Sequence, residues 1–259
     1  MNKILAFIIF GVILSTSHAH ALYVVDGSIG DWGIELNTNA ALIKEYLNTH
    51  VPSGENADKV TEDNADKNSY YAYVEPGYSG IGNQYDAEAM YFDNDHSYAY
   101  FAIVSGLSSQ ETVFPSGDIF LSTIANPFTS LSYEYAIDVF TGNLYTVGGK
   151  EDVYYSQHSI ANAWRLTRND DGTVASENTL LGHIDLVYSP LVNTHSVIEG
   201  RVPLAWINAD DDVWMHWTMK CGNDYLNLQG SVNTPEPATG ALLISGLFGL
   251  VGYGVRKRK

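Results

Sequence analysis

The sequence predicts a mainly β protein, with a single antiparallel two-sheet β-sandwich of jelly-roll type in residues 22–232. Residues that favour strands (Tyr, Val, Ile, Phe and Thr) are abundant, and the chain holds 18 Tyr and 23 Gly. Apolar runs in this region are short and separated by turn residues. About a dozen short strands in a region of ordinary domain size are typical of a sandwich. No internal repeat or second domain is evident.

Residues 1–21 have the pattern of a secretory signal peptide. Lys3 provides a positive charge, residues 4–14 are apolar, and Ala19-His20-Ala21 has the small-x-small form of a signal-peptidase site. A permanent anchor is the weaker interpretation, because the apolar run is too short to span a membrane. We therefore expect signal peptidase to cut after Ala21 and release the chain outside the cytosol.

Two hairpins are the clearest elements of the central region. In each, strand-like residues flank a polar turn: 88–92 and 98–104 around 93–96, and 134–140 and 144–147 around 141–143. Asp171-Gly172 predicts a tight turn after a strand at 164–167. Further strands are predicted at 23–25, 118–122, 182–187, 195–202, 214–219 and 225–228. Residues 40–47 have helical character, and residues 52–69 are polar enough to predict a long loop.

The last 27 residues, 233–259, combine three signals in a fixed order. Pro235-Glu236-Pro237 is rigid and extended, because proline fixes φ and lacks a backbone donor. Residues 238–255 carry no charge and span about 27 Å as a helix, close to the thickness of a hydrocarbon core. Arg256-Lys257-Arg258-Lys259 then resists crossing and stays cytoplasmic, so the preceding domain lies outside.

This tail resembles the PEP-CTERM sorting signal, which has a Pro-Glu-Pro motif, a hydrophobic span and a basic cluster in that order. The resemblance implies that an intramembrane exosortase, found in bacteria that make exopolysaccharide, recognises and processes the tail. An ordinary C-terminal membrane anchor is the alternative. The intact C-terminus at Lys259 in the mature protein would favour that alternative.

Short motifs in the central region resemble the family 9 carbohydrate-binding-like sandwiches. These have an Asp-Gly-x-x-x-x-Trp opening, an Asp-rich hairpin and a Glu-x-x-Ile-Pro strand in the same order. The matching residues are Asp26, Gly27, Trp32, Asp86, Glu199 and Pro203, and Val202 replaces the usual Ile. The intervals include a long insertion at residues 34–85. The resemblance implies a sandwich that often holds a structural calcium ion.

The formal net charge of −17 at pH 7 restricts the partners. Five of the 13 basic residues lie in the two predicted processed ends, so the central region is more acidic still. Nucleic acid is therefore not expected as a partner, because its phosphates need a basic surface. Cys221 is the only cysteine, so an intrachain disulfide is not possible; we expect a buried thiol, and an intermolecular bond is the alternative.

Calcium is the expected ion, because it takes six to eight oxygen ligands from carboxylates and carbonyls in loops. The candidate ligands lie near predicted strand ends, and the preferred ones are Asp86 and Glu88, followed by Asp63 and Asp93. The sequence around Asp93 is equally compatible with a polar turn, where Asp and Asn bond to the local backbone.

Carbohydrate binding needs exposed aromatic side chains as platforms for sugar rings, with polar groups for the hydroxyls. Tyrosines gather among glycines before Asp86, and we predict ligand contacts for Tyr78, Tyr85 and Trp32. The alternative is that tyrosines fill strands for packing reasons. This explains the strand tyrosines well and those of the predicted loop less well.

Catalysis is not expected. The sequence contains no nucleophile elbow and no His-Glu-x-x-His motif, and 30 carboxylates form chance pairs. The sequence therefore predicts an exported, exosortase-processed protein that is transiently anchored and then located at the cell surface or in a biofilm matrix. Its expected function is non-catalytic binding of exopolysaccharide. The alternatives are a purely structural acidic matrix protein and a polysaccharide-modifying hydrolase.

Overall fold

The computed structural model describes residues 23–36, 57–61, 87–124, 126–130, 132–152, 164–190, 195–220, 222 and 224–232. The predicted signal peptide, the helical segment at 40–47, Cys221 and the whole tail from residue 233 lie outside these residues. Within the described ranges, no helix has both the length and the apolar character needed to cross a membrane.

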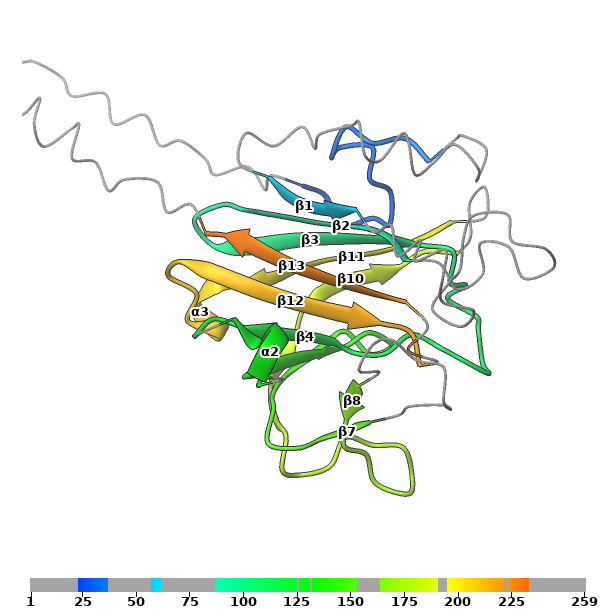
Figure 1. Ribbon diagram of the computed structural model, residues 1–259, viewed down its shortest axis with the longest axis vertical. Helices are drawn as coiled ribbons and strands as arrows, with labels where there is room; N and C mark the ends of the chain where they lie inside the picture. Colours follow the sequence, from blue (N-terminus) through cyan, green and yellow to red (C-terminus); the bar gives the residue numbers. More distant parts are fainter. Residues whose placement is uncertain are drawn as a thin grey trace, which may run out of the picture.

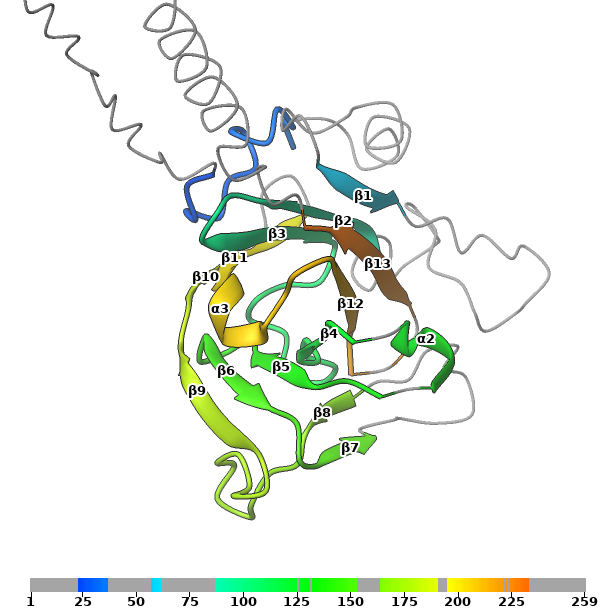
Figure 2. The same ribbon diagram turned by 90° about the vertical axis from the view of Figure 1, so that its left-hand side faces the viewer.

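Two antiparallel sheets form the body of the described protein (Figures 1 and 2). The five-stranded sheet has the order β1 (Asp58–Thr61), β2 (Ala87–Asn94), β3 (Tyr98–Ser105), β11 (Ser196–Pro203) and β10 (Asp185–Tyr188). The six-stranded sheet has the order β13 (Tyr225–Ser231), β12 (Asp212–Thr218), β4 (Ile119–Ser122), β5 (Tyr135–Asp138), β6 (Asn143–Thr146) and β9 (Thr179–His183). The expected mainly β, antiparallel fold is thus confirmed.

Three small elements complete the described fold. Strands β7 (Lys150–Asp152) and β8 (Trp164–Leu166) pair with each other as a two-stranded sheet. Two short helices follow strands: α2 (Pro127–Ser130) after β4, and α3 (Leu204–Ile207) after β11. Helix α3 begins directly after Pro203, which suits the start of a helix because its missing N–H is not needed there.

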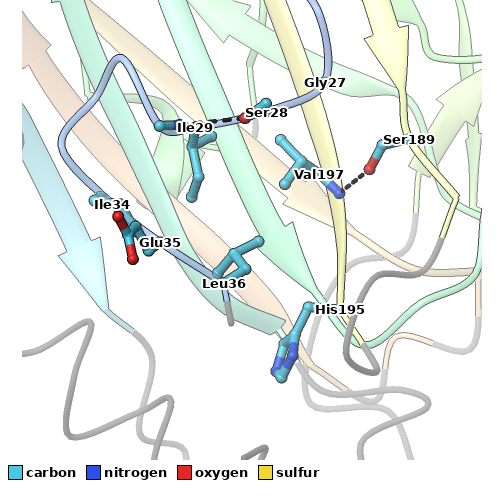
Figure 3. A pocket seen from close by; sticks show the side chains of 10 residues that line it. Gly27, Ser28, Ile29, Ile34, Glu35, Leu36, Ser189, His195 and Val197 are labelled. Atoms are coloured by element: carbon cyan, nitrogen blue, oxygen red, sulfur yellow. Dashed lines mark hydrogen bonds between the residues drawn. The ribbon is translucent and has the colours of Figure 1, made fainter. Parts of the chain in front are cut away.

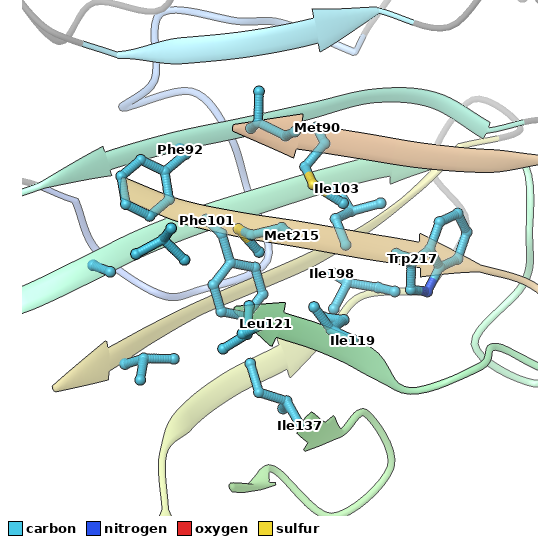
Figure 4. Packing of buried hydrophobic residues seen from close by; sticks show 14 of the residues in the cluster. Met90, Phe92, Phe101, Ile103, Ile119, Leu121, Ile137, Ile198, Met215 and Trp217 are labelled. Carbon is cyan, nitrogen blue, oxygen red and sulfur yellow. The ribbon is translucent and has the colours of Figure 1, made fainter. Parts of the chain in front are cut away.

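The main core lies between the two large sheets (Figure 4). Alternation along the strands explains its composition, since successive side chains of a strand point to opposite faces. In β12, for example, Val213, Met215 and Trp217 are buried in the core. The other buried residues that Figure 4 labels are Met90, Phe92, Phe101, Ile103, Ile119, Leu121, Ile137 and Ile198.

Along one side of the body, strand β13 packs beside β1 and β2 of the opposite sheet. The Phe92 ring occupies the space above Gly230, where an added Cβ would lie only 2.2 Å from a ring carbon. The Ser231 N–H donates to Asp58 Oδ2 at 2.6 Å. These contacts join the two sheets at this side.

The N-terminal segment, residues 23–36, covers the outer face of the five-stranded sheet (Figure 2). Its buried residues Tyr23, Ile29, Trp32 and Ile34 form a second core with side chains from three strands. Those partners are Ala89, Tyr91, Tyr100, Ala102, Val104 and Val197. As a result β2 is buried on both faces along its whole length.

A third cluster lies on the outer face of the six-stranded sheet, where strands β7 and β8 pack on it. Trp164 and Leu166 of β8 cover Phe120 of β4 and Ala136 of β5, and Tyr133 completes the cluster. The β7–β8 pair therefore covers the middle of this sheet.

The two predicted hairpins are confirmed as β2–β3 and β5–β6. The turn at Asp171-Gly172 is also present, with Gly172 at a φ of 83°. The structure differs at residues 23–25, which form no strand, and at Asp58–Thr61, where β1 occupies part of the predicted loop.

The predicted strand at 182–187 is divided between two sheets. Strand β9 pairs with β6, while β10 pairs with β11. Ile184, which is 3 % exposed, lies between them and packs in the main core. The chain changes sheet at Ile184, and Gly182 lies two positions earlier in β9. A single Gly within a strand pattern suggests an irregularity but does not show that the chain crosses to the other sheet.

Candidate functional site

The outer face of β12 and β13 presents aromatic and polar side chains in register. Trp214 lies opposite Gln229, His216 opposite Asn227, and Thr218 opposite Tyr225. The inward side chains of both strands are apolar and buried, so these outward ones define the surface. Trp214, Tyr225 and Asn227 are partly exposed, Gln229 is exposed and His216 is buried. We call Trp214, His216, Tyr225, Asn227 and Gln229 the β12–β13 face.

Hydrogen bonds hold the polar side chains of this face in place. His216 Nδ1 lies 2.7 Å from Asn227 Oδ1, and Gln229 Nε2 donates to Asp212 Oδ2 at 2.9 Å. Among the described residues, the Trp214 indole N–H and the Tyr225 hydroxyl have no hydrogen-bond partner. The face therefore combines fixed amides with two aromatic side chains whose polar atoms remain available.

Rings from neighbouring elements pack against this face. The Phe128 ring of α2 meets Trp214 edge-on, with ring centroids 5.4 Å apart. On the other side, His216 contacts the rings of Trp164 and Tyr133, with centroids 5.3 and 6.0 Å away. Such contacts limit the rotamers open to Trp214 and His216, and side chains that are already ordered lose less entropy when a ligand binds.

The Lys150 ammonium group lies in the aromatic cluster beside the face. Its Nζ is 3.6 Å from the centroid of Trp164 and 5.2 Å from that of Tyr133. Partial burial lowers the pKa of Lys150. The negative faces of the rings attract the ammonium group, so this lysine helps to attach β7–β8 to the sheet.

Arg168, Asp118 and Asp138 form a cluster of charged side chains beside β8. Arg168 Nη2 is 3.1 Å from Asp138 Oδ2 and 3.6 Å from Asp118 Oδ1, and the Leu166 N–H donates to Asp118 Oδ2 at 2.8 Å. Burial, together with the nearby Asp138 carboxylate, raises the pKa of Asp118 to about 7. The single Arg168 guanidinium thus pairs with two buried carboxylates. Because two negative charges face one positive charge, proton uptake by Asp118 is favoured.

Trp32, for which the sequence predicts a ligand contact, is instead 0 % exposed. Its indole stacks on the Tyr23 ring with centroids 3.7 Å apart, and its Nε1 donates to Glu199 Oε1 at 3.0 Å. Trp32 therefore has no open face for a sugar ring, and we correct that prediction: it is a core residue.

Three of the motif residues that the sequence analysis matched, Asp26, Gly27 and Trp32, meet around the carboxylate of a fourth, the buried Glu199. The backbone N–H groups of Asp26 and Gly27 donate to Oε2 at 3.0 and 2.8 Å, and Trp32 donates to Oε1. Burial raises the pKa of Glu199, while these hydrogen bonds lower it in part. The arrangement holds the N-terminal segment on the sheet, so these residues act in folding.

The two described calcium candidates, Glu88 and Asp93, do not share a site. They lie five positions apart on β2, roughly 16 Å at the rise of a strand. Glu88 Oε1 is 2.9 Å from His195 Nε2, and Asp93 Oδ2 accepts a 2.8 Å hydrogen bond from Tyr23. Burial raises the pKa of Asp93. In the described part of the chain, no group of three or more His, Cys, Asp or Glu could hold a metal ion.

The other predicted site residues lie outside the described ranges. They are Asp63, Asp86, Tyr78, Tyr85, Ala19, Ala21, Pro235, Glu236, Pro237, Arg256, Lys257, Arg258 and Lys259. A calcium site that includes Asp63 and Asp86 stays a prediction, as does sugar contact at Tyr78 and Tyr85.

Sequence reasoning did not identify the β12–β13 face as a site. Trp214 and Trp217 lie three positions apart, so they point to opposite faces of β12. The alternation was visible in the sequence, but either tryptophan could have been the outward one.

Comparison with known proteins identifies the C-terminus. The family model described as the PEP-CTERM protein-sorting motif matches residues 233–259. The chain carries a PEP-CTERM sorting motif. No curated protein and no solved structure matches the chain. The PEP-CTERM motif implies an exported protein whose C-terminal sorting signal is processed by exosortase.

The PEP-CTERM motif begins immediately after Val232, the last described residue. Strand β13 ends at Ser231, and the Val232 N–H donates to Asp211 O at 2.5 Å. The described strands thus extend to within two residues of the sorting motif, and the β12–β13 face belongs to the exported part of the protein.

Proposed function

We propose that the protein is a non-catalytic binder of exopolysaccharide at the cell surface or in the extracellular matrix, where it arrives after exosortase processing. The β12–β13 face would hold the polysaccharide. The observation that carries this proposal is the pair of partly exposed aromatic side chains, Trp214 and Tyr225, whose polar atoms have no partner among the described residues.

The side chains of this face suit sugars. The rings of Trp214 and Tyr225 can pack on the apolar faces of sugar rings, while the amides of Asn227 and Gln229 can bond to hydroxyl groups. Thr218, opposite Tyr225, is four positions from Trp214, so the two rings are separated by roughly 13 Å along the strands. This spacing suits an extended chain better than a single sugar.

Charge supports a polysaccharide over a nucleic acid. The chain has a formal net charge of −17 at pH 7, and Asp210, Asp211 and Asp212 precede Trp214. These carboxylates would repel a phosphate backbone. They would also disfavour a uronate-rich polysaccharide, so the preferred ligand is uncharged.

The test is binding of the exported protein to exopolysaccharide isolated from its host, by affinity electrophoresis. We expect Trp214→Ala and Tyr225→Ala each to weaken binding about tenfold, the equivalent of about 1.4 kcal/mol. Phe140→Ala is the control, because Phe140 is an aromatic residue that is 55 % exposed and lies in the β5–β6 turn. Equal affinity of all three variants would exclude this face.

Two other outcomes decide between the proposal and its alternatives. Absence of any polysaccharide binding by the wild-type protein would favour a purely structural acidic matrix protein. Release of new reducing ends from the polysaccharide would favour a hydrolase instead.

A further inference from the structure

A cavity of about 310 Å³ lies on the opposite sheet, beneath the N-terminal segment (Figure 3). One wall comes from that segment, with Ile29, Ile34 and Leu36. The other comes from β11 and the residues beside it, with Val197, His195 and Ser189. The volume falls at the lower end of the range of small-molecule sites.

The walls of the cavity are mainly apolar. Ile29, Ile34 and Val197 are at most 2 % exposed, and Leu36 packs partly buried against the same cluster. Contacts in the second core fix these side chains, and the bonds to Glu199 fix the segment above them. The cavity is therefore a built part of the fold.

Two buried polar residues, Ser189 and His195, also line the cavity. Ser189 Oγ accepts the Val197 N–H at 2.9 Å, and its own hydroxyl hydrogen has no acceptor among the described residues. Ser189 is 8 % exposed and lines the cavity. His195 is 0 % exposed and its Nε2 is engaged with Glu88.

The rim of the cavity is polar and acidic. Ser28, Gly30 and Glu35 line it and are exposed. The Glu35 carboxylate and the net charge of −17 disfavour an anionic ligand at this opening.

We propose that this cavity binds a small, uncharged, mainly apolar molecule with one hydrogen-bond acceptor, of the class of short-chain esters. The hydrocarbon part packs on the partly exposed Leu36 and on the small accessible surfaces of Ile29, Ile34 and Val197, and the ester carbonyl accepts the Ser189 hydroxyl. This site lies on the sheet opposite the β12–β13 face, so the inference does not depend on the proposed function.

Gly30 offers a way to close the cavity without disturbing the fold. A Cβ added there meets only Ser28 Oγ, at 3.6 Å, and the backbone of Gly30 is not in the left-handed region. Gly30→Phe therefore places a ring at the rim, while Gly30→Ala is the matched control.

The experiment measures binding of the neutral fluorescent probe N-phenyl-1-naphthylamine to the exported protein. We expect wild type and Gly30→Ala to bind it with equal affinity, and Gly30→Phe to bind at least about tenfold more weakly. Ethyl butanoate should displace the probe, whereas butanoate should not. Trp214→Ala should bind the probe like wild type.

Three results would overturn the inference: no probe binding by the folded wild-type protein, equal binding by Gly30→Phe, or displacement by butanoate as effective as by the ester. A melting temperature of Gly30→Phe within a few degrees of wild type ensures that lost binding reports on the cavity. If that variant unfolds, ester-dependent stabilisation of the wild type replaces it as the test: a raised melting temperature is expected, and an unchanged one contradicts the proposal.

Discussion

The Trp32 indole N–H donates a 3.0 Å hydrogen bond to the Glu199 carboxylate, across 167 positions of the chain. Both side chains are almost completely buried, and the same carboxylate accepts two backbone N–H groups of the N-terminal segment. One side chain on a central strand thus fixes the position of a segment that has no strand of its own.

Glu199→Ala should therefore destabilise the protein strongly. It leaves the Trp32 indole and two backbone N–H groups without an acceptor, and a buried unsatisfied group costs about 1–3 kcal/mol. We expect a loss of about 3 kcal/mol or more in the free energy of unfolding, measured with urea. Glu199→Gln should lose less, since its amide oxygen can still accept one of these bonds.

The control for this variant is Asp185→Ala. Asp185 also pairs with a β11 residue, Arg201, but its side chain is 59 % exposed, and exposed ion pairs contribute little. Equal losses for Asp185→Ala and Glu199→Ala would contradict the role assigned to the buried carboxylate.

Substitution of three glycines by Ala distinguishes the cost of backbone strain from the cost of a steric clash. Gly27 has a φ of 81°, and an added Cβ would lie 2.8 Å from Val187 Cγ1. Gly172 has a φ of 83° with nothing within 4 Å of an added Cβ, and Gly30 has neither problem. The expected loss of stability on substitution by Ala is largest for Gly27, about 1–2 kcal/mol for Gly172, and near zero for Gly30. Thermal unfolding of the three variants checks this order, and a Gly27→Ala variant as stable as Gly30→Ala would contradict it.

Asp118 should make stability depend on pH. Its pKa in the folded protein is about 7, above the ordinary value of 3.8. Between these values the folded state keeps a proton that the unfolded state has released. This contribution is complete below about pH 4, and stability falls as pH rises to about 7, by up to about 4 kcal/mol.

Urea unfolding at pH 5 and pH 8 tests this expectation. Asp118→Asn cannot titrate, so the difference in stability between the two pH values should shrink in this variant. Asp171→Asn is the control, because Asp171 is exposed and its pKa is lowered. An undiminished pH dependence in Asp118→Asn would show that other groups cause it.

The β2–β3 hairpin was predictable because its signal is local. Asp95 Oδ1 accepts the backbone N–H groups of Ser97 and Tyr98, as a turn aspartate commonly does. Alternating residues on either side then specify two strands. The β5–β6 hairpin follows the same logic, with Gly142 at a φ of 66° in its turn.

Features that depend on distant partners could not be predicted. Strand β1 exists through pairing with β2, more than 25 positions later, and its own sequence Asp-Lys-Val-Thr is too short and polar to be recognised. Likewise, the sequence around Trp32 does not show that residues 23–36 pack on the outer face of the five-stranded sheet and bury this side chain there. For the β12–β13 face, alternation identifies two sets of side chains, and only the packing of the opposite sheet decides which set faces outward.

The response of the protein to calcium tests whether Glu88 and Asp93 act as ligands of one ion. The two carboxylates lie at opposite ends of β2 with separate partners, His195 and Tyr23, so they do not bind one ion together. We expect the melting temperature of Asp93→Asn to respond to EDTA and to added calcium as the wild type does.

Asp86→Asn is the informative comparison, since the remaining calcium prediction depends on Asp86 and Asp63. If the melting temperature no longer responds to calcium in Asp93→Asn but still responds in Asp86→Asn, the ion binds beside Asp93, at the C-terminal end of β2. That result would contradict our expectation. A wild-type melting temperature that is unaffected by EDTA and by calcium would remove the calcium prediction for all four carboxylates.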